Sequence, residues 1–375
     1  MNKREFLKCL TLAGASASLM PSEALGNNLL SAMNIPNPLP VKEKEARFYV
    51  VTPRGVKCLI CPNECTLKDG ELSDCHNRIA RNGKLYTLAY GNPCAVHIDP
   101  VEKKPLLHFY PASLAYSIAT AGCNFACLNC QNWETSQTSP TRTRNYEASP
   151  EQIVNLALRE KCHSIAYTYT EPVTFYEYML DTATLAKSKG IRNIMVSNGF
   201  INREPLLKLC QVIDGANIDL KTFDEEVHLK MTAGTLKPVL ETLRTFREQG
   251  IWLEITNLII PSWTDNFDDI SRMCDWLVRE GFQDYPLHFS RFQPHHKLTR
   301  LPVTPLQSLT RAKEIALKAG LRYVYIGNVP GIGGEDTYCH ACKVLLVKRN
   351  GFEIEQNLIV NGRCPKCQTQ IPGRW

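Results

Sequence analysis

The chain lacks any apolar run approaching the about 20 residues that a membrane-spanning helix requires, and it lacks a strong excess of one charge. Lysine and arginine number 43 against 37 acidic residues, which gives a net charge of +6 over 375 residues. The basic residues are scattered, and this pattern disfavours a dedicated nucleic-acid-binding surface. The length suits one large domain with smaller additions.

Cysteine departs from this ordinary composition, because the chain has 16 of them. Most fall in closely spaced groups that contain C-x2-C pairs. Such pairs are typical of metal or cluster ligands held as thiolates, whereas structural disulfides rarely show that spacing. We therefore expect a reducing working environment.

The first 26 residues resemble a leader. They have a basic start, a short apolar run and a small-residue end, and "KREFLK" is similar to a bacterial twin-arginine signal in which Lys3 replaces the first arginine. The sequence leaves open whether this segment directs export or is an extension that is never cleaved. Residues 27–45 are polar and contain prolines, which indicates a linker.

A cysteine-rich region is expected over residues 46–112. Four thiols lie within eighteen residues and are separated by turn-forming residues, so they can surround one metal centre: Cys58, Cys61, Cys65 and Cys75. Zinc and an additional iron–sulfur cluster both remain open for this group.

A second group of four cysteines is expected to form a zinc-ribbon-like module over residues 331–375. Two C-x2-C pairs flank strand-like sequence, and their cysteines are Cys339, Cys342, Cys364 and Cys367. Sites of this kind are usually closed and structural, so we assign this one no chemistry.

Residues 113–330 alternate between strand-like and amphipathic helix-like segments. Strand-like runs are expected at 114–120, 164–170, 191–197, 215–220, 252–260, 286–292 and 321–327. This alternation indicates an α/β fold with a parallel sheet and crossover helices. Six or seven units are too few for a closed eightfold barrel, so the sequence predicts a partial (β/α)6 TIM-like open barrel.

In such barrels, functional residues gather at the carboxyl ends of the strands. The polar residues that the sequence places at or near those ends are Thr170, Glu171, Asn198, Asp219, Lys221, Glu254, Thr256, Asn257, His288 and Arg291. We expect them to form one rim.

The loop after the first of these strands holds three cysteines, Cys123, Cys127 and Cys130, in the spacing C-x3-C-x2-C. Three thiolates leave one iron of a [4Fe–4S] cluster open to another ligand. The alternative is a zinc site that His163 or His288 completes.

These motifs resemble the radical S-adenosylmethionine (SAM) enzymes, in the branch of the pyruvate formate-lyase activating enzymes. The resemblance is carried by "GCNFACLNCQNWETSQ", "YTYTEP" and "NIDLK". "DPVEKKPLLHFYP", "PLHFSRFQP" and "YVYIGNVPG" are similar, more narrowly, to the radical SAM member of the AmmeMemoRadiSam system.

The resemblance implies a [4Fe–4S] cluster on the three-cysteine loop, with SAM chelating its open iron and being cleaved to methionine and a 5′-deoxyadenosyl radical. Thr170 and Glu171 match the segment that holds the methionine amine, and Asn198 matches a contact to the sulfonium or ribose. Asp219 and Lys221 match the motif whose lysine meets the carboxylate. His288 matches a histidine near the ribose and adenine.

One position departs from the family pattern. The residue before the third cysteine is usually an aromatic that packs on adenine, and here it is Asn129. Phe125 and Trp133 are the candidates for that stacking.

The substrate cannot be derived from the sequence. Hydrogen abstraction from a protein or peptide, including a glycyl position, and action on a small metabolite or nucleic acid both remain open. So does a non-catalytic scaffold that binds several zinc ions. The enzyme hypothesis implies a low-potential electron donor and, by resemblance, the two companion proteins of the AmmeMemoRadiSam system. SAM and low-potential electrons are cytoplasmic supplies, which favours a cytoplasmic location, whereas a leader that acts as a signal would direct export.

Overall fold

The computed structural model describes residues 41–375. The predicted leader at 1–26 lies outside the described residues, as does most of the predicted linker at 27–45. The last two residues of that linker form the short strand β1 (Lys44–Glu45), which pairs with β6 (Lys84–Thr87).

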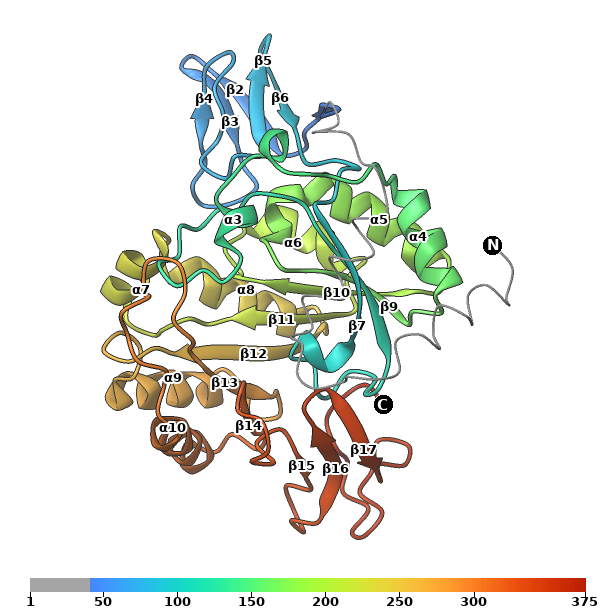
Figure 1. The fold of residues 1–375 in the computed structure, drawn as a ribbon, viewed down its shortest axis with the longest axis vertical. Helices are drawn as coiled ribbons and strands as arrows, with labels where there is room; N and C mark the ends of the chain where they lie inside the picture. The colour runs from blue at the N-terminus through green and yellow to red at the C-terminus, as the bar shows by residue number, and fades with distance from the viewer. Residues whose placement is uncertain (1–40) are drawn as a thin grey trace, which may run out of the picture. The chain divides into compact units, whose positions relative to one another are not determined.

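The main sheet has eight strands in the order β14-β13-β12-β11-β10-β9-β8-β7 (Figure 1). Its seven parallel strands are β8 (Leu114–Ala119), β9 (Ser164–Tyr167), β10 (Arg192–Ser197), β11 (Gly215–Asp219), β12 (Trp252–Ile259), β13 (Leu287–Arg291) and β14 (Val324–Gly327). β7 and β14 form the two edges and do not pair with each other. The predicted partial, open barrel is therefore confirmed.

The sheet begins earlier than residue 113, where the sequence placed the start of the core. β7 (Ala95–Pro100) runs antiparallel to β8, with Ala95 opposite Ala119 and Pro100 opposite Leu114. This strand was not predicted, and it makes the cysteine-rich region continuous with the barrel.

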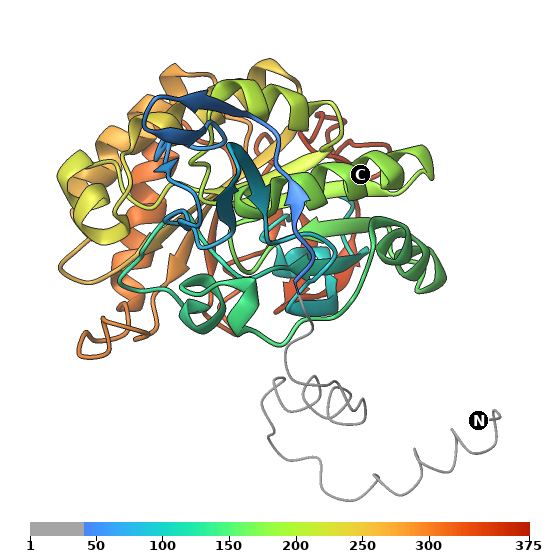
Figure 2. The ribbon, with the colours of Figure 1, turned by 90° about the horizontal axis from the view of Figure 1, so that it is seen from above.

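Crossover helices connect the parallel strands and lie around the outside of the sheet (Figure 2). They are α4 (Pro150–Arg159), α5 (Tyr176–Ser188), α6 (Arg203–Cys210), α8 (Lys237–Glu248), α9 (Phe267–Arg279) and α10 (Leu306–Ala319). Shorter elements are α3 (Trp133–Ser136), α7 (Glu225–Thr232), η1 (Val101–Lys103), η2 (Pro140–Arg142) and η3 (Pro172–Phe175).

Local sequence explains where α4 begins. The Ser149 side chain accepts a hydrogen bond from the Gln152 backbone N–H, and the Gln152 side chain accepts one from the Ser149 N–H. This reciprocal capping satisfies two backbone donors that the first turn of a helix leaves free.

Two small antiparallel sheets precede β7. One has the order β2-β3-β4 and the other β1-β6-β5. Their remaining bounds are β2 (Tyr49–Thr52), β3 (Gly55–Cys58), β4 (Thr66–Leu67) and β5 (Arg78–Arg81).

A third small sheet follows β14 in the chain. It is formed by β15 (Thr337–Tyr338), β16 (Leu345–Asn350) and β17 (Glu353–Asn357). Its apolar side packs with Leu107, Tyr323 and Tyr325 of the barrel in one buried cluster. The Arg349 guanidinium on β16 also donates a hydrogen bond of 2.8 Å to the Leu107 carbonyl. The C-terminal module is thus joined to the barrel by both apolar and polar contacts.

Candidate functional site

A cavity of about 810 Å³ lies where the parallel strands end. Its wall contains the residues that the sequence assigned to the loops after β8, β9, β10 and β11: Cys123, Cys127, Cys130, Thr170, Glu171, Asn198, Asp219 and Lys221. Parallel strands bring their carboxyl ends to one edge of a sheet, and this is why residues so far apart in the sequence meet here.

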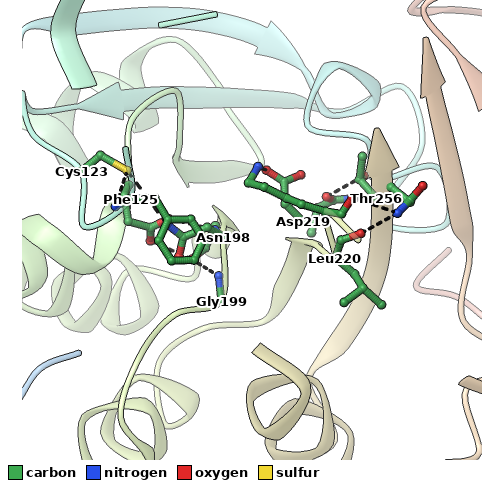
Figure 3. Close-up of polar contacts among 12 residues, drawn as sticks. Cys123, Phe125, Asn198, Gly199, Asp219, Leu220 and Thr256 are labelled. Carbon is green, nitrogen blue, oxygen red and sulfur yellow. Dashed lines mark hydrogen bonds and ion pairs between the residues drawn. The ribbon is translucent and has the colours of Figure 1, made fainter. Parts of the chain in front are cut away.

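The three thiols of the loop after β8 are free cysteines in this wall. The Cys123 Sγ accepts a hydrogen bond of 3.4 Å from the Phe125 N–H, and the Asn198 Nδ2 lies 4.0 Å from the same sulfur (Figure 3). Burial raises the pKa of the Cys123 thiol well above its ordinary value, and the Glu171 carboxylate raises it further. Burial also raises the pKa of Cys127 to about 11, although Lys221 opposes this rise.

Glu171 is buried and lines the cavity. Its carboxylate accepts hydrogen bonds from the Ser197 hydroxyl at 2.7 Å, the Asn198 N–H at 2.8 Å and the Val173 N–H at 3.0 Å. Burial raises the pKa of Glu171 to about 7, and these hydrogen bonds limit the rise. The group can therefore change its charge near neutral pH. The neighbouring Thr170 hydroxyl donates to the Thr120 carbonyl at 2.6 Å.

Lys221 brings a positive charge to the cavity. Its Nζ lies 2.9 Å from the Asp219 Oδ2. Asp219 lies opposite Thr256 of the neighbouring strand β12 in the parallel backbone register (Figure 3). Burial alone would lower the pKa of Lys221, but the charge of Asp219 and the thiols Cys127 and Cys130 raise it overall. The amine stays protonated, so it can meet an anionic ligand group and favour deprotonated thiols.

The donor set fits an iron–sulfur cluster with an amino-acid ligand. Three free thiols supply soft ligands for iron. The buried Glu171 carboxylate and the Lys221 ammonium provide opposite charges, which match the amine and the carboxylate of a methionine moiety. Asn129 adds a buried Oδ1 without a hydrogen-bond partner among the described residues, in the same wall.

Four of the residues expected at the rim do not line the cavity: Glu254, Thr256, Asn257 and His288. Thr256 and Asn257 lie within β12. Glu254 and His288 stand near the beginning of β12 and β13, not at their carboxyl ends. The His288 Nε2 pairs with the Glu254 Oε2 at 2.7 Å, and Glu254 also accepts the N–H groups of Leu107 and His108. His288 is not among the described residues that line the cavity. Its position therefore does not support the predicted contact to ribose and adenine.

The positions of the histidines also disfavour a zinc site on the three-cysteine loop. His163 packs against Tyr110, and His288 is held by Glu254. Within residues 41–375, no histidine or carboxylate joins these thiols in a group whose ligand atoms all lie within 4.8 Å of one another. The predicted fourth ligand for zinc is therefore not in place.

Phe125 and Trp133, the candidates for stacking on adenine, differ in position. Phe125 borders the cavity, but its ring is buried against Phe200 and lies close to Gly234. Trp133 stacks on His296, with ring centroids 5.2 Å apart. Of the two, Phe125 alone belongs to the wall.

The sequence did not predict that the C-terminal module would contribute to this cavity. Glu335, Arg349 and Phe352 all belong to its wall. Phe352 lies in the turn between β16 and β17 and is exposed. Nothing in the local sequence indicates this role, because it depends on how the module packs on the barrel.

The two terminal cysteine groups differ in their spacing. In the C-terminal group all four sulfurs lie within 4.8 Å of one another, and the Sγ atoms are 3.6 Å apart both in Cys339–Cys367 and in Cys342–Cys364. A tetrahedral ion with bonds of about 2.3 Å to sulfur requires sulfurs about 3.8 Å apart. The geometry therefore fits a single metal ion. The N-terminal group lines a separate small cavity.

Comparisons with known proteins agree with this geometry. The model of the radical SAM superfamily matches residues 117–277. An uncharacterized protein from Methanocaldococcus jannaschii is 46% identical over 331 residues, which are 88% of this chain and 98% of the relative. Residues 117–277 of the chain therefore form a domain of the radical SAM superfamily. Membership implies a [4Fe–4S] cluster and SAM as cofactors, and it is consistent with the three-cysteine loop.

Two further relatives have more specific names. A protein of the same archaeon, provisionally named a glycyl-radical enzyme activating enzyme, is 27% identical over 57% of this chain and 78% of its own length. The pyruvate formate-lyase 1-activating enzyme of Escherichia coli K12 is 24% identical over 43% of this chain and 67% of its own. Separately, no helix in residues 41–375 has the length and apolarity needed to cross a bilayer.

Proposed function

We propose that this protein cleaves SAM reductively and uses the resulting radical to take a hydrogen atom from a protein glycyl position. A [4Fe–4S] cluster held by Cys123, Cys127 and Cys130 would supply the one electron, taken from a low-potential donor, that reductively cleaves the S–C5′ bond of SAM. The products would be methionine and a 5′-deoxyadenosyl radical, which would become 5′-deoxyadenosine by removing the substrate hydrogen.

The observation that carries this proposal is the meeting of three groups in one cavity wall. Cys123, Cys127 and Cys130 stand with Glu171 and Lys221 around the same cavity. The thiols would ligate the cluster, Glu171 would receive the methionine amine and Lys221 its carboxylate. Two fixed charges of opposite sign would orient SAM relative to the open iron, and the buried setting would strengthen both contacts.

The choice of a protein substrate is supported by the names of the two more distant relatives, which describe activating enzymes. The cavity is also large and is bordered by the exposed Phe352 of the C-terminal module. The two companion proteins of the AmmeMemoRadiSam system are the first substrates or partners to test.

We also propose zinc for the C-terminal group, because four thiolates in tetrahedral spacing are typical of a closed structural zinc site. Its role would be to hold β15, β16 and β17 in the position where Arg349 and Phe352 reach the cavity.

The first test is anaerobic. The protein is loaded with iron and sulfide, reduced and mixed with SAM, and 5′-deoxyadenosine is quantified. We expect product from the parent and none from the Cys123→Ala/Cys127→Ala/Cys130→Ala variant. The matched control is Cys210→Ala on α6, a free cysteine outside the three groups, which should behave as the parent. A cluster-loaded parent that makes no 5′-deoxyadenosine with any reductant would contradict the proposal.

The substrate is tested by isotope transfer. Each companion protein is produced with glycine deuterated at Cα and added to the reaction. Deuterium in the 5′-deoxyadenosine identifies a glycyl position as the hydrogen source. If 5′-deoxyadenosine forms with each companion protein but contains no deuterium, neither protein supplies a glycyl hydrogen. The proposal of a glycyl substrate in these partners would then be wrong, whereas the proposal of SAM cleavage would still hold.

A further inference from the structure

The four N-terminal cysteines come together around one small cavity of about 20 Å³. It is lined by Cys58, Cys61, Cys65 and Cys75, and also by Arg78 and Asn124. Cys58 is the last residue of β3, and the other three cysteines lie in loops outside the strands. No disulfide joins them, because each is a free cysteine. The sequence grouping is therefore a spatial grouping as well.

Their spacing differs from that of a single-ion site. In the described chain, the C-terminal cysteines are the one set of three or more candidate ligands whose atoms all lie within 4.8 Å of one another. The N-terminal cysteines do not meet this criterion, and neither do Cys123, Cys127 and Cys130. Around a single zinc ion the sulfurs must be about 3.8 Å apart. A cubane holds them farther apart, since each thiolate binds a different iron.

The surroundings favour a negatively charged centre. Arg78 lines the same small cavity as the four thiols. Arg78 is buried and is held by the Glu177 carboxylate. A buried guanidinium beside four thiols reduces the cost of taking their anionic forms out of water.

The cavity adjoins the loop of the radical SAM cluster. The Asn63 Nδ2 donates a hydrogen bond of 3.1 Å to the carbonyl of Asn124, the residue after Cys123. Gly122, the residue before Cys123, has a φ of +98°, and a Cβ there would lie 2.5 Å from the Cys75 carbonyl oxygen. The two cysteine groups therefore share a direct backbone contact.

We propose that Cys58, Cys61, Cys65 and Cys75 ligate a second [4Fe–4S] cluster, packed against the loop that carries Cys123. Cys65 is partly exposed while the other three are buried, so one side of this centre faces solvent and the other faces Asn124. A one-electron reductant at the solvent side can pass an electron inward, and the centre returns to its starting oxidation state when it passes that electron on. This electron-delivery role rests on the proposed function, whereas the metal assignment does not.

Metal content tests the assignment in the full-length chain. In the Cys123→Ala/Cys127→Ala/Cys130→Ala variant, purified anaerobically after loading with iron and sulfide, we expect about four iron atoms per chain from the remaining cluster. About one zinc should accompany them at the C-terminal group. Less than one iron with about two zinc ions would overturn the proposal. This variant cannot cleave SAM, so its iron content does not depend on whether the parent does.

Electron paramagnetic resonance tests the proximity of the two centres. We expect the dithionite-reduced parent to show signals broadened by spin–spin coupling. The broadening should disappear both in the triple variant and in Cys58→Ser/Cys61→Ser. Unbroadened signals in a parent that holds both clusters would overturn the packing. Should the double variant fail to fold, the parent and the triple variant still decide the question.

Discussion

Arg78 and Glu177 face each other through two parallel hydrogen bonds, of 3.0 Å and 2.9 Å, with side chains that are only 1% and 0% exposed. Arg78 lies on β5 of the N-terminal sheets and Glu177 on α5 of the barrel. The pair therefore joins the cysteine-rich region to the barrel. Each of the two buried charges is neutralised by the other.

We expect Arg78→Met to lower the free energy of unfolding by about 3–5 kcal/mol, because it leaves a buried carboxylate unpaired. Anaerobic chemical denaturation measures the change. Arg203→Met is the matched control, since Arg203 pairs with Glu248 at the surface and should lose far less. Equal decreases in the free energy of unfolding of the two variants would show that the buried pair stabilises the fold no more than the surface pair does.

Gly122→Ala should disturb both cysteine groups. Its left-handed φ disfavours a side chain, and the new Cβ would collide with Cys75 and Asn77. Gly250→Ala controls for the backbone, because Gly250 has a φ of +69° with open space around it. We expect Gly122→Ala to retain much less iron than this control after identical loading. Similar iron contents would mean that the contact between the loops does not matter.

The sequence predicted the barrel well, because its strands carry a local signal. The run at 114–120 became β8 (Leu114–Ala119), and that at 252–260 became β12 (Trp252–Ile259). The three-cysteine loop was identified from its C-x3-C-x2-C spacing. Glu171 and Lys221 were expected beside it because parallel strands place their carboxyl ends together.

Tertiary contacts decided what the sequence could not show. Glu254 and His288 were expected at the rim, but strand position and the donors from Leu107 and His108 place them in the interior. Phe352 reaches the cavity only because the C-terminal module packs on the barrel. The residue pattern alone shows neither the interior position of Glu254 and His288 nor the position of Phe352 at the cavity.

Lys221→Met should weaken SAM binding about 10–100-fold, since a hydrogen bond to a charged group contributes about 1.5–3 kcal/mol. Calorimetric titration of the anaerobic, cluster-loaded protein measures the affinity. Lys103→Met is the control, because Lys103 also lies in the cavity wall but pairs with Asp99. Equal affinities in the two variants would remove Lys221 from the SAM site.

SAM affinity should increase as the pH rises through about 7. Burial raises the pKa of Glu171 from its ordinary value of 4.5 to about 7, so the carboxylate that would bind the methionine amine forms only near that pH. The sign for stability is opposite: the native state holds its proton longer, so this group's contribution declines as the pH rises from 4.5 through about 7. Binding curves for the parent and Glu171→Gln test this, and the variant's affinity should be lower and lack this pH step.

Removing the C-terminal metal should affect the cavity as well as stability. We expect Cys364→Ser to lose the zinc proposed for the C-terminal group while keeping the parent's iron content, because this cysteine belongs to a separate group of four. Its melting temperature should decrease, since a structural zinc stabilises the fold that holds it. The rate of 5′-deoxyadenosine formation should also decrease, because Arg349 and Phe352 of the same module line the cavity. Cys210→Ser serves as the control for cysteine replacement. If the variant loses zinc but cleaves SAM at the parent's rate, the C-terminal module contributes to stability and not to SAM cleavage.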